Sequence, residues 1–151
     1  MKVITKNLEE TQGEARKFVE SLNAMAKNGQ LGEGATVVGL SGDLGSGKTS
    51  FVQGIAKAFN IKDKILSPTF VIQKRYPLKD HSHFKNLIHI DAYRLDKPEQ
   101  IVPIGWHDLS KDKQNIIFIE WPEKIAPFLL KDHKKIIFEF IDPEKRGIEI
   151  L

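Results

Sequence analysis

The chain of 151 residues contains no cysteine. This absence excludes thiol catalysis, disulfides, iron–sulfur clusters and cysteine-ligated zinc. The sequence also lacks an apolar run of about 18 residues, and its first residues lack the shorter apolar run of a secretory signal. We therefore expect a cytoplasmic protein that does not enter a membrane.

Neither sign of charge is in large excess. Lysine and arginine together number 23 and aspartate and glutamate 20, which gives a formal net charge of +3. Such a small surplus permits contact with nucleic acid but does not indicate it. No repeat, low-complexity tract or linker interrupts the sequence, so we expect one domain over residues 1–151.

Hydrophobic periodicity predicts two helices with a strand between them. The first helix begins at Thr11, which has a glutamate three residues later in capping-box spacing, and ends near residues 28–29. The second runs from Lys48 to about residue 60, with its apolar residues on one side. Residues 35–40 form an apolar run without alternation, which is typical of a strand buried on both faces of a parallel sheet.

The rest of the chain reads as strands, turns and short helical pieces. The segments predicted as strands are 70–76, 87–91, 116–120, 136–141 and 147–151. The polar stretch 77–85 forms either a hairpin or a surface excursion, and residues 96–110, which prolines interrupt, are predicted as short helical pieces and loop. One α/β domain is the simplest account of this pattern.

A glycine-rich segment joins the strand at 35–40 to the helix at Lys48. Residues 42–49 match the P-loop pattern G-x-x-x-x-G-K-[ST] without a mismatch. The glycines let backbone N–H groups point at phosphate oxygens, and the start of the helix adds a partial positive charge. Lys48 is expected to reach the β- and γ-phosphates, and the Thr49 hydroxyl a magnesium ion. The residues predicted to bind nucleotide here are Gly42, Asp43, Leu44, Gly45, Ser46, Gly47, Lys48, Thr49 and Ser50.

A P-loop site also needs a carboxylate near the metal ion, usually at the carboxyl end of a neighbouring strand. Asp91 follows Leu87-Ile88-His89-Ile90, and Glu120 follows Ile116-Ile117-Phe118-Ile119, so each acid lies at the end of a predicted strand. One of them could hold magnesium while the other orients the attacking water, and the spacing does not assign the two parts. Thr69, in the sequence Ser67-Pro68-Thr69, is either an ordinary turn residue or a sensor of the γ-phosphate.

Four segments, taken in order along the chain, resemble the TsaE family. They are residues 42–49, Ser67-Pro68-Thr69-Phe70, His89-Ile90-Asp91-Ala92-Tyr93-Arg94-Leu95 and Glu120-Trp121-Pro122. The resemblance covers nearly the whole chain. It implies a P-loop NTPase-like three-layer α/β domain, in which a largely parallel sheet is flanked by helices and has antiparallel closing strands. It also implies ATP or ADP as the ligand, Lys48, Asp91 and Glu120 as catalytic residues, and Thr69 as a switch residue. Thr49, Asp91 and Glu120 are the residues that it implies for Mg²⁺.

The resemblance further implies a biological role. The TsaE family is the ATPase component of bacterial tRNA N6-threonylcarbamoyladenosine synthesis at position 37, and it associates with the TsaB–TsaD heterodimer. A magnesium-dependent accessory ATPase is therefore expected, with carbamoyl transfer left to TsaD and any contact with tRNA indirect. Two departures, Ala92 in place of a larger apolar residue and a less acidic segment at 101–106, concern one surface and not the phosphate site.

Two other functions are compatible with the P-loop alone. A small-molecule kinase would need an arginine-rich lid and an acceptor pocket, neither of which the sequence indicates, and a nucleotide-gated binding module would hydrolyse ATP only incidentally. None of the four arginines lies where an arginine finger can be inferred, so we expect slow hydrolysis by the isolated chain. His81, His83 and the basic cluster of Lys131, His133, Lys134 and Lys135 are interpreted as solvated surface.

Overall fold

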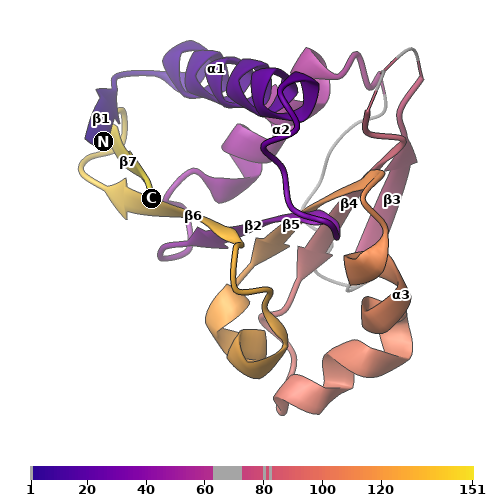
Figure 1. Ribbon diagram of the computed structural model, residues 1–151. Coiled ribbons are helices and arrows are strands. Elements are labelled where there is room, and N and C mark those ends of the chain that lie inside the picture. The colour runs from indigo at the N-terminus through magenta and orange to yellow at the C-terminus, as the bar shows by residue number, and fades with distance from the viewer. Residues whose placement is uncertain (1, 63–72, 80, 82) are drawn as a thin grey trace.

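The computed structural model describes residues 2–62, 73–79, 81 and 83–151. Within these residues, seven strands form one sheet in the order β1-β7-β6-β2-β5-β4-β3 (Figure 1). Their bounds are Lys2–Thr5 (β1), Thr36–Ser41 (β2), Gln73–Pro77 (β3), Asn86–Asp91 (β4), Asn115–Glu120 (β5), Lys134–Phe140 (β6) and Arg146–Ile150 (β7). The neighbours β6, β2, β5 and β4 run parallel, whereas the pairs β1–β7, β7–β6 and β4–β3 are antiparallel. The predicted largely parallel sheet with antiparallel closing strands is confirmed.

Helices cover both faces of this sheet (Figure 1). Their bounds are Leu8–Lys27 (α1), Lys48–Ala58 (α2), Pro98–Ile104 (η1), Trp106–Lys111 (α3) and Pro122–Phe128 (η2). The apolar residues of α1 and α2 share one core cluster with Val38 and Phe118, whereas those of η1, α3 and η2 share a second cluster with Val37 and Ile117. Adjacent residues of β2 and β5 thus enter opposite cores, as the two-residue period of a doubly covered strand requires.

Helix α1 begins one turn earlier than its sequence pattern predicts. Asn7 is the N-cap, and its side-chain oxygen accepts a hydrogen bond from the backbone N–H of Glu10 at 2.8 Å. The prediction of a capping box at Thr11 is therefore wrong: Thr11 is buried within the helix, and its hydroxyl lies 2.7 Å from that of Thr5. Hydrophobic periodicity does not predict the first turn of α1, because its apolar residue Leu8 is exposed and does not belong to the buried face. Within the ranges given above, no helix combines the length and the apolar character needed to cross a membrane.

The remaining departures lie at the edges of the sheet. β1 was not predicted, and neither was the short helix η2. Of the two readings of residues 77–85, the hairpin agrees with the structure, because β3 and β4 pair antiparallel and the Leu78 N–H donates to the Lys85 carbonyl at 2.8 Å. The predicted start of β3 at Phe70 and the Ser67-Pro68-Thr69 turn lie outside the described residues.

Candidate functional site

The glycine-rich segment occupies the connection between β2 and α2, where the motif requires it. Gly42, Gly45 and Gly47 have φ values of +148°, +79° and +106°. A Cβ on Gly42 would also lie 2.5 Å from the backbone oxygen of Phe138. Gly47 caps α2 with left-handed backbone and no side-chain hydrogen bond, so the first amides of the helix remain available to an anion.

Lys48 is almost fully buried beside this loop, at 4% exposure. Its ammonium donates a hydrogen bond to the Gly42 carbonyl and lies 4.1 Å from the centre of the Trp121 ring. Burial lowers the pKa of Lys48, and the carboxylates of Glu120 and Asp91 partly oppose that shift. An ammonium group that is buried in this way is strongly stabilised when an anionic ligand binds beside it.

Asp91 and Glu120 end the adjacent parallel strands β4 and β5 and are directly paired in register. Both are buried, at 7% and 4% exposure. They face a cavity of about 440 Å³ whose lining residues are Leu44, Gly45, Gly47, Lys48, Thr49, Ser50, Asp91, Tyr93, Glu120, Trp121 and Arg146. The structure therefore brings Lys48, Thr49 and the two predicted acids together. Gly42, Asp43 and Ser46 belong to the loop but do not line the cavity.

Loop residue Ser46 carries a buried hydroxyl with no hydrogen-bond partner among the described residues. A buried polar atom of this kind is costly unless something satisfies it. Ser46 does not line the cavity, but the uncapped start of α2 and the desolvated Lys48 fit a site that receives hydrogen-bond acceptors from a ligand. Among the described residues, no cluster of three His, Cys, Asp or Glu side chains could hold a metal ion by itself. Magnesium in nucleotide sites needs only one or two carboxylates, because phosphates and water supply the other ligands.

His89 is a site residue whose role the sequence reasoning missed. Its Nε2 lies 2.7 Å from Oε2 of Glu120, and the His89 side chain is fully buried. Since a carboxylate only accepts hydrogen bonds, the Nε2–H group of His89 donates the hydrogen bond and Glu120 accepts it. Nδ1 has no partner among the described residues. The available signal was a histidine inside an otherwise apolar strand, on the same face as Asp91 two residues later.

Trp121 follows Glu120 directly and lines the cavity. Its φ and ψ are 60° and 52°, a left-handed conformation that is an outlier for a bulky residue. Its ring packs on Tyr93 with centroids 5.2 Å apart and covers the Lys48 ammonium. The same ring contacts the second core cluster. Trp121 is thus part core and part wall of the cavity.

Arg146 lies beside the loop, although its position in the sequence does not indicate this. It lines the cavity, and a Cβ on Gly47 would meet its Cγ at 3.6 Å. Arg146 begins β7, which pairs antiparallel with β6, and β6 in turn lies parallel to β2. The start of β7 is therefore at the same edge of the sheet as the P-loop, a placement that local sequence spacing cannot reveal.

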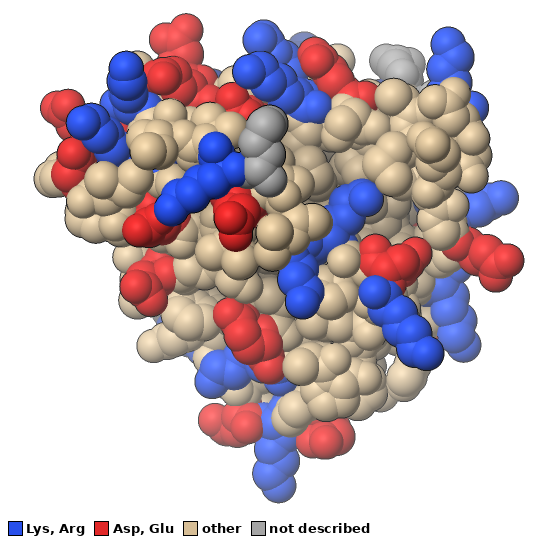
Figure 2. Space-filling model, turned by 60° about the vertical axis from the view of Figure 1, so that its left-hand side comes forward, with Lys and Arg blue, Asp and Glu red and all other residues tan. Residues whose placement is uncertain are grey.

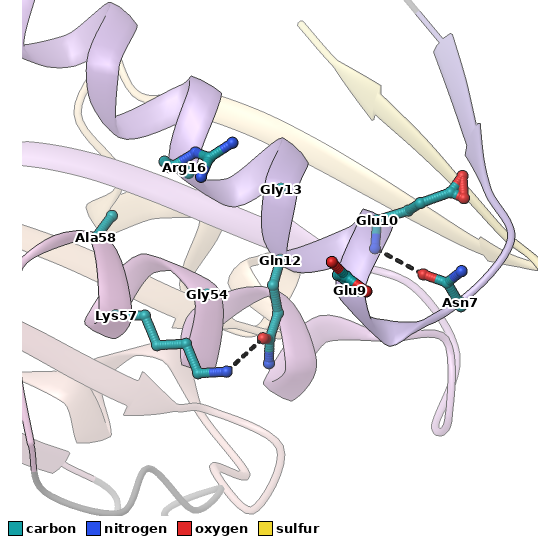
Figure 3. Close-up of a pocket in the computed structure, with 9 residues that line it drawn as sticks. All are labelled: Asn7, Glu9, Glu10, Gln12, Gly13, Arg16, Gly54, Lys57 and Ala58. Carbon is teal, nitrogen blue, oxygen red and sulfur yellow. Dashed lines mark hydrogen bonds between the residues drawn. The ribbon is translucent and has the colours of Figure 1, made fainter.

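A second and larger cavity, of about 710 Å³, lies between α1 and α2 (Figure 3). The residues that line it are Asn7, Glu9, Glu10, Gln12, Gly13, Arg16, Gly54, Lys57 and Ala58. Lys57 donates to the side-chain oxygen of Gln12 at 2.7 Å. Buried charged groups converge in the smaller cavity and not in this one, so the smaller cavity is the candidate site.

Two of the histidines that the sequence analysis interprets as solvated surface, His81 and His133, have structural partners. His81 contacts Asn23 at 2.8 Å and stacks on the ring of Phe84. His133 donates from Nδ1 to the Leu130 carbonyl at 2.7 Å. On the face drawn in Figure 2, basic and acidic side chains are interspersed. That distribution is typical of a solvated surface.

Comparison with protein families matches residues 5–148 to "Threonylcarbamoyl adenosine biosynthesis protein TsaE". A "tRNA threonylcarbamoyladenosine biosynthesis protein TsaE" from Rickettsia felis is 33% identical over 150 residues, which are 99% of this chain and 78% of the relative. A protein with the same description from Synechocystis sp. is 36% identical over 117 residues, or 72% of this chain and 70% of the relative. The crystal structure of YdiB from Bacillus subtilis superposes with a TM-score of 0.71 and 27% identity, over 99% of this chain and 83% of that one.

Proposed function

The chain belongs to the TsaE family, which takes part in tRNA threonylcarbamoyladenosine biosynthesis, and from this premise we propose that it is a magnesium-dependent ATPase. It acts as an accessory subunit of the TsaB–TsaD complex, in the cytoplasm where its tRNA is modified, and does not itself transfer the carbamoyl group. The observation that carries the proposal is the convergence of the P-loop, the buried Lys48 and the two buried acids on one cavity.

The residues present fit a nucleoside triphosphate with magnesium. The loop amides and Lys48 would hold the phosphates, and Thr49 with a carboxylate of Asp91 or Glu120 would hold the metal ion. When bound, magnesium neutralises charge on the phosphates. The uncapped start of α2 and the buried Lys48 support an anionic ligand here.

Asp91 and Glu120 together bind the metal ion and orient the attacking water. Asp91 has one oxygen engaged by the backbone N–H of Tyr93 at 3.0 Å, and Glu120 has one oxygen engaged by His89. These contacts orient the two carboxylates, and we assign the metal ion and the attacking water to the pair without dividing the two parts between them. Trp121 covers this end of the cavity and reduces its contact with bulk water.

The test measures ATP binding by calorimetry and phosphate release in the presence of magnesium, with and without TsaB–TsaD. Lys48→Ala is expected to weaken ATP binding roughly 10- to 100-fold, because the phosphates lose a charged hydrogen-bond donor. Glu120→Ala is expected to keep ATP binding while hydrolysis falls. Lys57→Ala, which removes an exposed lysine from the same helix, serves as the matched control.

Hydrolysis is expected to be slow for the isolated chain and faster in the complex. Among the described residues, Arg146 is the one arginine that lines the cavity, and its guanidinium is already bonded to backbone carbonyls. Fast turnover that ignores TsaB–TsaD would contradict the accessory role. Phosphate appearing on an added metabolite would indicate a kinase, and unimpaired tRNA modification by Glu120→Ala would indicate a binding module with incidental hydrolysis.

A further inference from the structure

Arg146 lines the P-loop cavity, but the roles assigned above to the P-loop and to the two acids do not involve it. Its aliphatic stem rests against the loop, since Cγ and Cδ lie 3.6 Å and 3.8 Å from the position that a Cβ on Gly47 would take. These are ordinary van der Waals distances. The side chain is therefore packed along the last glycine of the phosphate loop.

The guanidinium of Arg146 is held in one orientation. Nη1 donates to the carbonyl of Asp142 at 2.6 Å and to that of Lys145 at 3.0 Å. The turn that carries these carbonyls is itself fixed, because the Asp142 carboxylate accepts from the N–H groups of Glu144 and Lys145 at 2.8 Å each. A guanidinium that is already ordered loses little entropy when a ligand binds.

One face of this guanidinium is covered from within the chain. The Phe140 ring centre lies 4.7 Å from Cζ of Arg146. Arg146 also lines the cavity, and a ligand that stacks on its guanidinium would use the face turned away from Phe140. A planar cation of this kind stacks on aromatic rings. Leu44 lines the same cavity with 73% of its side chain exposed, and adds an apolar surface for a ring or a ribose.

The order of the strands decides which part of a nucleotide reaches Arg146. The P-loop follows β2, the acids lie on β5 and β4 to one side of it, and Arg146 begins β7 beyond β6 on the other side. The end of a triphosphate that needs magnesium and water must point to the acids. The base then extends towards β6 and β7, away from the reacting phosphate.

We propose that Arg146 binds the purine base of the nucleotide by stacking its guanidinium on the ring. The inference rests on the proposed function, because it requires the triphosphate to occupy the P-loop. It assigns Arg146 to nucleotide affinity and not to the stabilisation of charge at the γ-phosphate.

The experiment measures binding of ADP, ATP and inorganic tripolyphosphate by calorimetry in the presence of magnesium. Arg146→Ala is expected to weaken ADP and ATP equally, about 5- to 30-fold, because a stacking contact of this size is lost. Tripolyphosphate has no base, so its affinity is expected to stay within about twofold of wild type. Arg146→Lys, which keeps the charge but not the planar group, is expected to give a smaller loss, and Arg75→Ala on the distant strand β3 none.

Two results would overturn the inference while leaving the proposed function intact. An equal loss of ADP and tripolyphosphate binding would mean that Arg146 contacts phosphate, and unchanged nucleotide affinity with slower hydrolysis would make it an arginine finger. If wild type bound neither ATP nor tripolyphosphate, the proposed function would fail together with the inference. Thermal melting of Arg146→Ala and Arg146→Lys separates loss of binding from loss of fold, and an affinity loss that both folded variants share for nucleotides alone supports the stacking role.

Discussion

Replacing His89 with alanine tests whether the buried imidazole fixes the Glu120 carboxylate. The bond between them is 2.7 Å long, with His89 fully buried and Glu120 4% exposed. His89→Ala removes the donor and leaves a carboxylate oxygen that water cannot easily reach. His89→Gln is the conservative variant, because its amide nitrogen extends to about the position of Nε2.

The expected loss of stability follows from the burial of both partners. An unsatisfied buried acceptor costs about 1–3 kcal/mol, and a charged one costs more. We expect His89→Ala to lower the free energy of unfolding by about 3 kcal/mol, and His89→Gln by less than half of that. Urea denaturation of the ligand-free protein measures both values.

A double-mutant cycle isolates the pair from the cavity that each alanine leaves. The cycle combines His89→Ala with Glu120→Ala, and we expect a coupling energy of about 1–3 kcal/mol. Ile88→Ala is the matched control. Ile88 is as fully buried in β4 as His89, but it belongs to the second core cluster, with Val37 and Ile117. This variant should destabilise the fold without lowering kcat of the folded enzyme, whereas His89→Ala lowers kcat and leaves ADP affinity unchanged. A coupling energy below about 0.5 kcal/mol would refute the reasoning.

Three further outcomes are expected from the same structure. Burial lowers the pKa of Lys48, so between its folded pKa and 10.5 the unfolded chain binds more protons and stability rises with pH. Lys48→Met should remove that rise in urea titrations at several pH values and raise the melting temperature of the ligand-free protein. A bound nucleotide is expected to draw the Lys48 ammonium away from the Trp121 ring. In a Trp106→Phe background Trp121 is the one remaining tryptophan, so adding ADP should change the tryptophan fluorescence. Gly54→Ala puts a Cβ 2.8 Å from α1 and should cost about 1–3 kcal/mol in urea denaturation. Gly13→Ala, which meets nothing within 4 Å, should instead stabilise by about 0.5–1 kcal/mol.

The fold was predictable where the local pattern and the final environment agree. β2 and β5 read as apolar runs because both faces are covered, and α2 reads as a helix because one side is buried. β1 has no such signal, because only Thr5 of its four residues is buried and it exists as a strand through pairing with β7. The N-cap was misplaced for a similar reason: Asn7 and Thr11 are both good caps, and burial of Thr11 decides between them.

Some residues of the candidate site could likewise be predicted from the sequence, and others could not. Asp91 and Glu120 could be paired in advance because carboxyl ends of parallel strands share one edge of the sheet. The roles of His89 and Arg146 arise from pairings between segments far apart in the chain, which no local spacing encodes. The positive φ angles of the loop glycines, by contrast, could be expected from the sequence, because glycine adopts such angles without steric cost.

The residues that break local rules gather beside Glu120. His89 places an imidazole with one unpartnered nitrogen in an apolar strand, and Trp121 adopts a left-handed backbone that costs about 1–3 kcal/mol. Asn60, the other positive-φ residue besides glycine in the described ranges, is of a type that tolerates this conformation. At Trp121 the following Pro122 disfavours the right-handed helical region, and the Trp121 N–H donates to the Leu40 carbonyl at 3.3 Å. The strain is therefore imposed by neighbours on both sides, and its effect is to set an aromatic ring over the P-loop lysine. Because sequences generally satisfy local rules except where function overrides them, this clustering is independent physical support for assigning the chemistry to the smaller cavity.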